Sequence, residues 1–318
     1  MTTDSDPQRW LQATDGGLYC APGDFYVDPH RPAERAVITH GHADHARPGH
    51  GHVMATGQTL DIMAIRYGAD HARATQAAEY GEIIDIGDVS VRFHPAGHVL
   101  GSAQIAVEWQ GMRIVASGDY KPRPDPTCET FEPVDCDVFI TEATFALPVF
   151  RHPEAASEIG RLLASLKRNP DRAHMIGAYS LGKAQRLLAL VDESIGPILT
   201  HGAVEGTNGV LRAQGYRLPE TRQVLPDTDA KSFPGPLVLA PPSALGTPWA
   251  RRFGASSSAL SSVQAEALGA SAAMVSMKVK TKLRIMSPLQ SALARHLLPC
   301  LPLLPAWLPS ARAYRAPQ

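Results

Sequence analysis

The chain carries the run His40-Gly41-His42-Ala43-Asp44-His45 directly after the apolar residues 36–38. Three imidazoles and a carboxylate therefore stand at the end of an expected buried strand, and these are the ligands that zinc prefers in catalytic sites. His40 and His42 are two residues apart, so in an extended segment both point to the same side and can share one metal ion. Asp44 and His45 follow the turn and can face a neighbouring ion. The alternative is a histidine-rich surface loop, to which His50 and His52 would also belong.

A second motif places His98 between Gly97 and Gly101, after the expected strand 89–93. A single histidine at a strand end is usually a hydrogen-bonded core residue. Glycines on both sides let the backbone approach a partner closely. The motif therefore favours His98 as a further ligand of the same metal site.

Two carboxylates follow at the ends of later strands. Asp119 comes after Ser117 and Gly118; a Gly-Asp pair alone indicates a turn, but in this order after the histidines it indicates a carboxylate that bridges two ions. Glu142 ends the apolar strand 138–141, where an unpaired carboxylate is costly. It is either an ordinary charge at a strand exit or a group that orients a catalytic histidine.

The composition is that of a globular protein. The chain has 318 residues, 44% of them hydrophobic and 19% charged, with a net charge of −1; this length suits two ordinary domains. A net charge near zero does not indicate a general nucleic-acid binder, so any phosphate-binding groove must be a local basic patch. The four cysteines are scattered, which predicts a reduced, cytoplasmic setting. We expect no secretion signal and no membrane span.

The pattern of hydrophobic residues and turns predicts an α/β fold with two parts. Up to about residue 144 we expect strands with one helix, 58–67, and from about 153 strands that alternate with helices, which is typical of a small parallel α/β unit. The expected strands are 25–27, 36–39, 83–86, 89–93, 103–109, 113–116, 138–141, 174–178, 198–200 and 237–240, and the later helices are 155–167, 182–192 and 203–214. The predicted division is 1–150, 151–254 and an atypical tail, 255–318.

The motifs together resemble the metallo-β-lactamase superfamily. The ordered series HxHxDH, a glycine-flanked histidine and Gly-Asp carries this resemblance, and the stretch 141–145 followed by an inserted α/β unit is similar to the β-CASP branch, whose members are nucleases. Three longer phrases resemble the bacterial ligase-associated DNA exonucleases, also labelled mRNA 3′-end processing factors: Asp24-Phe25-Tyr26-Val27-Asp28-Pro29, Ser117-Gly118-Asp119-Tyr120-Lys121 and Tyr179-Ser180-Leu181-Gly182-Lys183-Ala184-Gln185-Arg186. The resemblance runs from about residue 10 to about 254.

This resemblance implies an αββα sandwich, the metallo-β-lactamase core, with a small inserted β-CASP-like domain. It implies one zinc held by His40, His42 and His98, a second held by Asp44 and His45, and Asp119 between them; manganese is the alternative ion. The catalytic carboxylates would be Asp44, Asp119 and Glu142. Tyr179, Lys183 and Arg186 would face the phosphate path, although for Lys183 and Arg186 a solvated helix start is the alternative.

The implied activity is hydrolysis of DNA phosphodiesters by a metal-activated hydroxide, in the manner of an exonuclease working in repair. The implied partners are DNA and an ATP-dependent DNA ligase or a helicase of the same pathway. An RNA-processing nuclease would share every one of these motifs. A small-molecule hydrolase would use the same metal ions, but it needs no inserted unit that clamps a phosphate backbone.

The resemblance ends after residue 254. Members of the family carry two more histidine phrases near the C-terminus, and the only histidine after 254 here, His296, matches neither; His201 has the Thr-His-Gly form of one but lies inside the inserted unit. The tail has one acidic residue, Glu266, against seven Lys and Arg. It is either a genuine diverged tail or the product of a reading-frame shift. We therefore expect a second metal site that lacks a ligand, and a catalytically silent nucleic-acid-binding protein is the remaining alternative.

Overall fold

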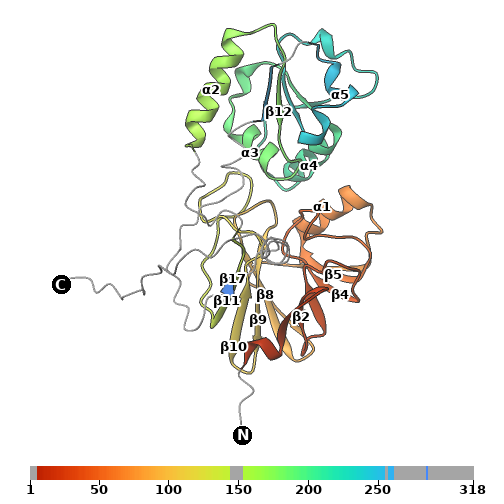
Figure 1. Cartoon of the computed structure of the whole chain (residues 1–318), viewed down its shortest axis with the longest axis vertical. Helices are drawn as coiled ribbons and strands as arrows, with labels where there is room; N and C mark the ends of the chain where they lie inside the picture. Colours follow the sequence, from red (N-terminus) through yellow and green to blue (C-terminus); the bar gives the residue numbers. More distant parts are fainter. Residues whose placement is uncertain (1–5, 144–152, 255–256, 261–283, 286–318) are drawn as a thin grey trace, which may run out of the picture. The chain divides into compact units, whose positions relative to one another are not determined.

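The computed structural model describes residues 6–143, 153–254, 257–260 and 284–285 (Figure 1). These residues lie in one compact unit, Met1–Ile285, and their strands form three sheets. The hydrophobic pattern of the tail also predicts a weak strand at 274–285 and a helix at 289–298, and apart from 284–285 both lie outside the described residues. Short 3₁₀ helices occur at Pro7–Arg9 (η1), Glu193–Ile195 (η2), Ala230–Ser232 (η3) and Pro242–Ala244 (η4).

The first sheet runs in chain order from β1 to β6. Its strands are β1 (Leu11–Thr14), β2 (Gly17–Cys20), β3 (Phe25–Val27), β4 (Arg35–Val37), β5 (His50–Thr56) and β6 (Ala72–Ala78). The first three strands are antiparallel, and β3 to β6 are parallel. Carboxyl ends of parallel strands meet at one sheet edge, so Asp28, which follows β3, lies beside the residues that follow β4.

The second sheet has the order β17-β11-β10-β9-β8-β7. Its strands are β7 (Ile83–Ile86), β8 (Val89–Pro95), β9 (Ala103–Trp109), β10 (Met112–Ala116), β11 (Val138–Thr141) and β17 (Arg284–Ile285). β7 to β10 are antiparallel, whereas β11 pairs parallel with β10 and β17. Both sheets therefore contain parallel and antiparallel strand pairs, and each sheet can pack one face on a core.

The first two sheets share one hydrophobic core. Phe25 and Val37 of the first sheet pack with Phe93, Ile105 and Ile114 of the second, and each of these side chains is buried. The other face of the first sheet packs on helix α1 (Gly57–Tyr67) through a separate buried cluster. Among the described residues the outer face of the second sheet packs on the loop 120–137 instead of a helix. The structure thus contains the α-β-β part of the expected sandwich.

The third sheet is built only from residues after 173 and is entirely parallel. Its order is β14-β13-β15-β12-β16, with β12 (His174–Gly177), β13 (Ile198–Thr200), β14 (Arg222–Gln223), β15 (Leu237–Ala240) and β16 (Ser257–Leu260). Helices α2 (Ala155–Arg168), α3 (Lys183–Leu190), α4 (Gly202–Ala213) and α5 (Pro248–Arg251) surround it (Figure 1). The sheet has its own buried clusters, which confirms the expected parallel α/β unit.

Most predicted elements are present, but several observed elements of the first and third sheets have no predicted counterpart. Six expected strands, including 103–109 and 138–141, have the predicted bounds, and the predicted helices are found with ends that differ by one or two residues. The elements that were not predicted are β1, β2, β5 and β6 of the first sheet, β14 and β16 of the third sheet, and the short helix α5. No helix in the described part of the chain combines the length and apolar character needed to cross a membrane.

A candidate metal centre

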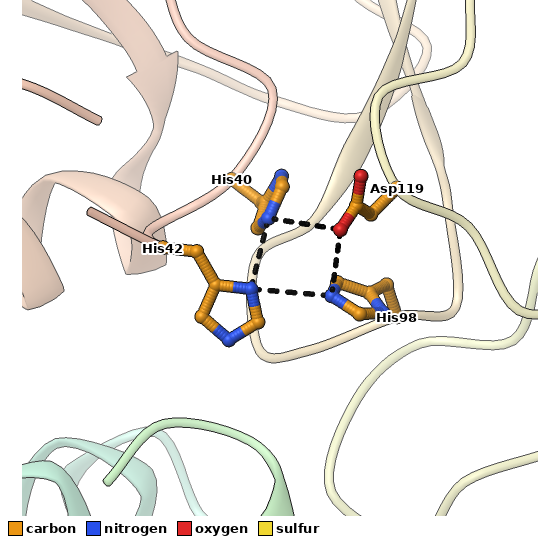
Figure 2. A group of neighbouring side chains, drawn as sticks. All are labelled: His40, His42, His98 and Asp119. Carbon is orange, nitrogen blue, oxygen red and sulfur yellow. Dashed lines mark hydrogen bonds and ion pairs between the residues drawn. The ribbon is translucent and has the colours of Figure 1, made fainter. Parts of the chain in front are cut away.

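Four side chains from three loops converge in the structure (Figure 2). His40 and His42 follow β4, His98 lies in the turn between β8 and β9, and Asp119 follows β10. His42 Nδ1 is 3.0 Å from His40 Nε2 and 3.2 Å from His98 Nε2. Asp119 Oδ2 is 3.5 Å from His98 Nε2 and 3.9 Å from His40 Nε2. One ligand atom from each residue lies within 4.8 Å of every other, and among the described residues this is the group that could hold a metal ion.

Hydrogen bonds to the outer ring nitrogens fix the tautomers of two of these histidines. His42 Nε2 lies 3.3 Å from the Leu181 carbonyl oxygen, which can only accept, so His42 Nδ1 carries the lone pair. His40 Nδ1 lies 3.1 Å from Thr39 Oγ1, whose hydroxyl proton is donated to Asp28 Oδ2 at 2.6 Å. Thr39 therefore accepts from His40 and leaves the lone pair of Nε2 directed toward the cluster. Outer partners of this kind orient metal-binding imidazoles.

Burial keeps the three histidines neutral. Desolvation lowers the pKa of His42 to about 4, and it holds the pKa of His40 and of His98 well below the usual range, with the neighbouring imidazoles adding to the shift. Neutral imidazole is the metal-binding form. Three lone pairs and a carboxylate oxygen that face each other repel without a cation between them, so this donor set fits a divalent ion such as zinc.

A second group of candidate ligands lies on the other side of the same carboxylate. His45 Nε2 is 3.4 Å from Asp119 Oδ1 and 3.8 Å from Asp44 Oδ2. Its Nδ1 donates to Asp28 Oδ2 at 2.8 Å. Burial lowers the pKa of His45, but the carboxylates of Asp28, Asp119 and Asp44 together outweigh burial and raise that pKa to about 9. The two oxygens of Asp119 thus face the two groups of histidines, as expected of a bridging carboxylate.

Close backbone approach explains two of the glycines around the cluster. At Gly97, φ is +71°, and a Cβ would lie 2.4 Å from the Lys121 carbonyl oxygen; at Gly118, φ is +53°, and a Cβ would lie 2.7 Å from the Thr39 side chain. A side chain at either position would force apart loops that carry ligands. The prediction that glycine lets the His98 loop approach its neighbours is confirmed in this sense.

The cluster opens into a cavity of about 700 Å³. Its walls come from the metal loops, from α1 and from the loops that follow β12 and β15: His42, Ala43, Asp44, Arg66, His98, Asp119, Glu142, Tyr179, Ser180, Leu181, Pro241, Pro242 and Ser243. Burial raises the pKa of the Asp119 carboxyl to about 6, opposed by His45 and reinforced by Glu142. The volume falls in the range of small-molecule and cofactor sites.

The three residues expected on the phosphate path take different positions. Tyr179 lines the cavity and is 49% exposed. Lys183 lies against it, with Nζ 3.9 Å from the centre of the Tyr179 ring, and burial lowers the pKa of Lys183 to about 8. Arg186 instead donates to Asp125 Oδ2 at 3.1 Å, where Lys121 is also paired. His201 accepts from the Ala203 backbone N–H at 3.2 Å and so caps α4, which fits a structural role.

Two residues at the site were not singled out from the sequence. Asp28 accepts from the Thr39 backbone N–H at 2.8 Å as well as from the Thr39 hydroxyl and His45. The available signal was an aspartate at the end of a strand, but only the parallel pairing of β3 with β4 brings it to the histidines. Arg66, on α1, donates to the Gly41 carbonyl oxygen and lines the cavity.

No family model matches the chain. It is 27% identical over 247 residues to a protein named "Probable DNA ligase" from Opitutus terrae, covering 76% of this chain and 24% of that protein. It is 30% identical to "Endoribonuclease ysh-1" from Neurospora crassa, over 37% of this chain and 14% of that protein. It is also 30% identical to "Cleavage and polyadenylation specificity factor subunit 3" from Dictyostelium discoideum, over 37% of this chain and 16% of that protein.

The chain therefore spans a quarter or less of the length of these relatives. Their similarity is distant. The same chain also carries the ordered HxHxDH series and a compact His/Asp cluster, in a fold with two packed sheets. These observations agree and support the metallo-β-lactamase/β-CASP family for this chain, through distant homology to proteins named as an endoribonuclease, a cleavage and polyadenylation factor subunit and a DNA ligase.

Proposed function

We propose that this protein is a metal-dependent phosphodiesterase that cleaves DNA as an exonuclease. The observation that carries the proposal is the His40–His42–His98–Asp119 cluster, which opens into a cavity whose wall also holds the guanidinium of Arg66. A metal centre beside a cation is suited to the charge that a phosphodiester gains during hydrolysis. The ligase-named relative, which matches over 76% of this chain, supports DNA as the substrate and a DNA ligase as a partner.

We assign the roles by position in the cavity. His40, His42 and His98 would hold one ion, Asp44 and His45 a second, and Asp119 would contact both. Bound divalent ions would polarise the phosphate and acidify a water molecule. Asp28 accepts the Nδ1 proton of His45 and so directs Nε2 toward Asp44 and Asp119, where a metal ion would take the place of the Nε2 proton. Glu142 lines the same cavity, where its carboxylate would orient a catalytic histidine.

The domain division belongs to the same proposal. We assign residues 1–150 to the metallo-β-lactamase core and 151–254 to a β-CASP-like inserted domain. The supporting observation is that the third sheet, its helices and its two buried clusters use only residues from 155 onward, with β16 (Ser257–Leu260) added to the sheet from the tail. The inserted unit contributes Tyr179 and Pro241 to the cavity wall, which is what a unit that clamps a nucleic-acid chain against the metal centre must do.

A nuclease that acts on RNA is the second candidate. It is favoured by the relatives named as endoribonucleases, which are 28–31% identical over 37% of this chain. The same donor set and cavity serve either substrate, because the metal ions act on the phosphate and not on the sugar.

A digestion assay with matched oligonucleotides tests the proposal. The full-length protein is incubated with end-labelled DNA and RNA of one sequence, with added zinc or manganese. We expect stepwise shortening of DNA that Asp119→Ala abolishes, whereas Asp85→Ala, an exposed carboxylate bonded to Ser90, keeps wild-type activity. Faster cleavage of RNA would shift the assignment to the second candidate.

Two other outcomes would reject a nuclease. Salt-sensitive binding of the oligonucleotides without metal-dependent cleavage would identify a silent binding protein. Hydrolysis of thioesters or lactams with neither binding nor cleavage of nucleic acid would identify a small-molecule hydrolase.

A further inference from the structure

The carboxyl edge of the third sheet ends at the metal cavity. β12 and β15 are parallel neighbours, with Gly177 opposite Ala240, so the residues that follow them emerge side by side. Those residues, Tyr179 on one strand and Pro241 with Pro242 on the other, line the cavity that also contains His42 and Asp119. Ligands of open parallel sheets bind at this edge, beyond the carboxyl ends of the strands.

Tyr179 is placed as an aromatic platform. It is one of few large apolar side chains in the described residues that are exposed, at 49%, although it lies in a cavity wall. The ammonium group of Lys183 lies 3.9 Å from its ring centre, and Lys183 itself is buried. This cation holds the ring in place and adds positive charge beside it. An exposed aromatic ring next to a cation is the arrangement that proteins use to stack unpaired bases.

We propose that this cavity receives the terminal nucleotide of a single-stranded nucleic acid, whose base stacks on the face of the Tyr179 ring opposite Lys183, beside the Pro241–Pro242 wall. The inference rests on the proposed function and deepens it, because it names the form of substrate. A base inside a duplex has both faces covered by its neighbours, so it cannot offer one to Tyr179. A cavity of about 700 Å³ also admits a nucleotide more readily than a base pair.

This placement gives Tyr179 a role toward the base and leaves the phosphate to the metal side of the cavity. The Tyr179 hydroxyl is not required for stacking, so a phenylalanine should replace it, whereas an aliphatic side chain should not. Loss of base–aromatic stacking is expected to weaken binding about 10- to 100-fold.

The test measures binding, so it does not depend on catalysis. Full-length protein in EDTA is titrated with fluorescent single-stranded oligonucleotides that end in a normal or an abasic nucleotide, made separately for the 5′ and the 3′ end. We expect the wild type to prefer the normal nucleotide about 10-fold or more at one of the two ends. Y179F should keep this preference and Y179A should lose it. L225A is the matched control, because Leu225 is similarly exposed, at 47%, on the same α/β unit and outside the cavity wall.

The outcomes separate this inference from the function on which it rests. Equal affinity of the wild type for normal and abasic nucleotides at both ends, or a preference that survives in Y179A, would overturn the base platform while leaving the nuclease proposal in place. Tight binding of blunt duplex in preference to single strands would also overturn it. Failure of the wild type to bind or cleave any of the oligonucleotides would refute the proposed function itself.

Discussion

At the scale of single residues, Asp28 organises the metal centre without belonging to the expected ligands. Its carboxylate accepts from the Thr39 backbone, the Thr39 hydroxyl and His45 Nδ1, so one side chain orients histidines of both candidate metal groups. It holds this position with φ at +46°, an uncommon conformation for a residue other than glycine. Strain of this kind persists where the surrounding contacts require it.

Asp28→Asn should therefore weaken the centre while leaving the fold intact. The amide can still accept from Thr39 through its oxygen, but it cannot supply the charge that stabilises the His45 contact. We expect metal affinity, or metal-dependent hydrolysis, to fall about 10- to 100-fold. Zinc titration by calorimetry measures the first, and hydrolysis of a chromogenic phosphodiester measures the second.

Asp24→Asn is the matched control for this experiment. Asp24 lies in the same segment with φ at +50°, and its side chain accepts from the Tyr19 hydroxyl at 2.9 Å, away from the histidines. The Asp24→Asn variant should bind zinc with the affinity of the wild type. Equal losses in the two variants would mean that the segment acts as a whole and that Asp28 has no role of its own.

The sequence predicted the converging residues well because their spacing and order are local properties. His40, His42, His98 and Asp119 each stand at a strand end, and the structure brings all four together. Asp28 and Arg66 were missed because nothing in their neighbourhood shows that β3 pairs parallel with β4 or that α1 points its last turn at the cavity. Such placements depend on tertiary packing, which a single sequence does not display.

At the scale of elements, a buried charge cluster ties α3 to the loop after β10. Asp125 accepts from Arg186 at 3.1 Å and from the Thr127 hydroxyl at 2.6 Å, and it is paired with the buried Lys121. These donors, with Lys121 contributing most to the shift, outweigh the effect of burial and hold the pKa of Asp125 below its usual value. The contact explains Arg186 better as a link between elements than as a phosphate ligand.

Arg186→Ala should consequently lower stability. Removing the guanidinium leaves Asp125 with fewer partners in a buried setting, which costs about 1–3 kcal/mol. Urea denaturation measures this loss. Arg73→Ala is the control, since Arg73 and its partner Glu34 are both exposed and such a pair contributes about 1 kcal/mol at most. If Arg186→Ala keeps wild-type stability but raises KM for DNA, the phosphate-path assignment from the sequence is the correct one.

A second pair of buried side chains joins the starts of β5 and β6. His50 and His71 are buried, and Nε2 of His50 and Nδ1 of His71 have no hydrogen-bond partner among the described residues. His50 Nδ1 accepts from the Ala33 N–H at 3.1 Å, which requires that nitrogen to be unprotonated. Burial lowers the pKa of both, partly opposed at His50 by the Arg47 carbonyl and at His71 by Asp70.

This pair predicts a pH dependence of stability with a definite sign. Below the ordinary histidine pKa of about 6.5, these two imidazoles bind protons in the unfolded chain but stay neutral in the folded one. Their neutral form therefore contributes its full stabilisation above that pH, and the free energy of unfolding decreases as the pH falls below it. Urea denaturation at pH 5 to 8 should show a shallower decrease for His50→Gln/His71→Gln than for the wild type. His52→Gln, which alters a side chain that is 62% exposed, should keep the wild-type slope; identical slopes in all three proteins would contradict the assignment.

The missed strands have physical explanations as well. β5 is buried at six of its seven positions, so it lacks the alternation that marks a half-buried strand, and its two histidines resemble further ligands. β6 lies at the edge of its sheet and is mostly exposed and rich in alanine, a composition that disfavours strands. Strands that alternate between turns, such as β8, were found because their pattern is local.

At the scale of the whole molecule, the α/β unit that carries the third sheet supports a residue of the metal centre. Leu181, just before α3, packs with Ile62 of α1 and Val99 of the His98 loop, and its carbonyl oxygen accepts from His42 Nε2. The unit therefore acts on a metal ligand through packing as well as through the cavity wall. Metal binding and the stability of this contact should be coupled.

Zinc should raise the melting temperature of EDTA-treated protein, and Leu181 should control the size of the rise. A ligand present at 100 times its Kd stabilises by about 2.7 kcal/mol, which corresponds to a rise of about 4 °C in melting temperature for a chain of this size. Leu181→Ala and Leu187→Ala each truncate a buried leucine and should cost about 2–5 kcal/mol. Leu187 lies within the core of the inserted unit, so its loss should lower the melting temperature but preserve the zinc-induced rise. Leu181→Ala loosens the segment that orients His42, so scanning calorimetry should show both a lower melting temperature and a smaller rise. Equal rises in the two variants would show that the inserted unit and the metal centre are energetically independent.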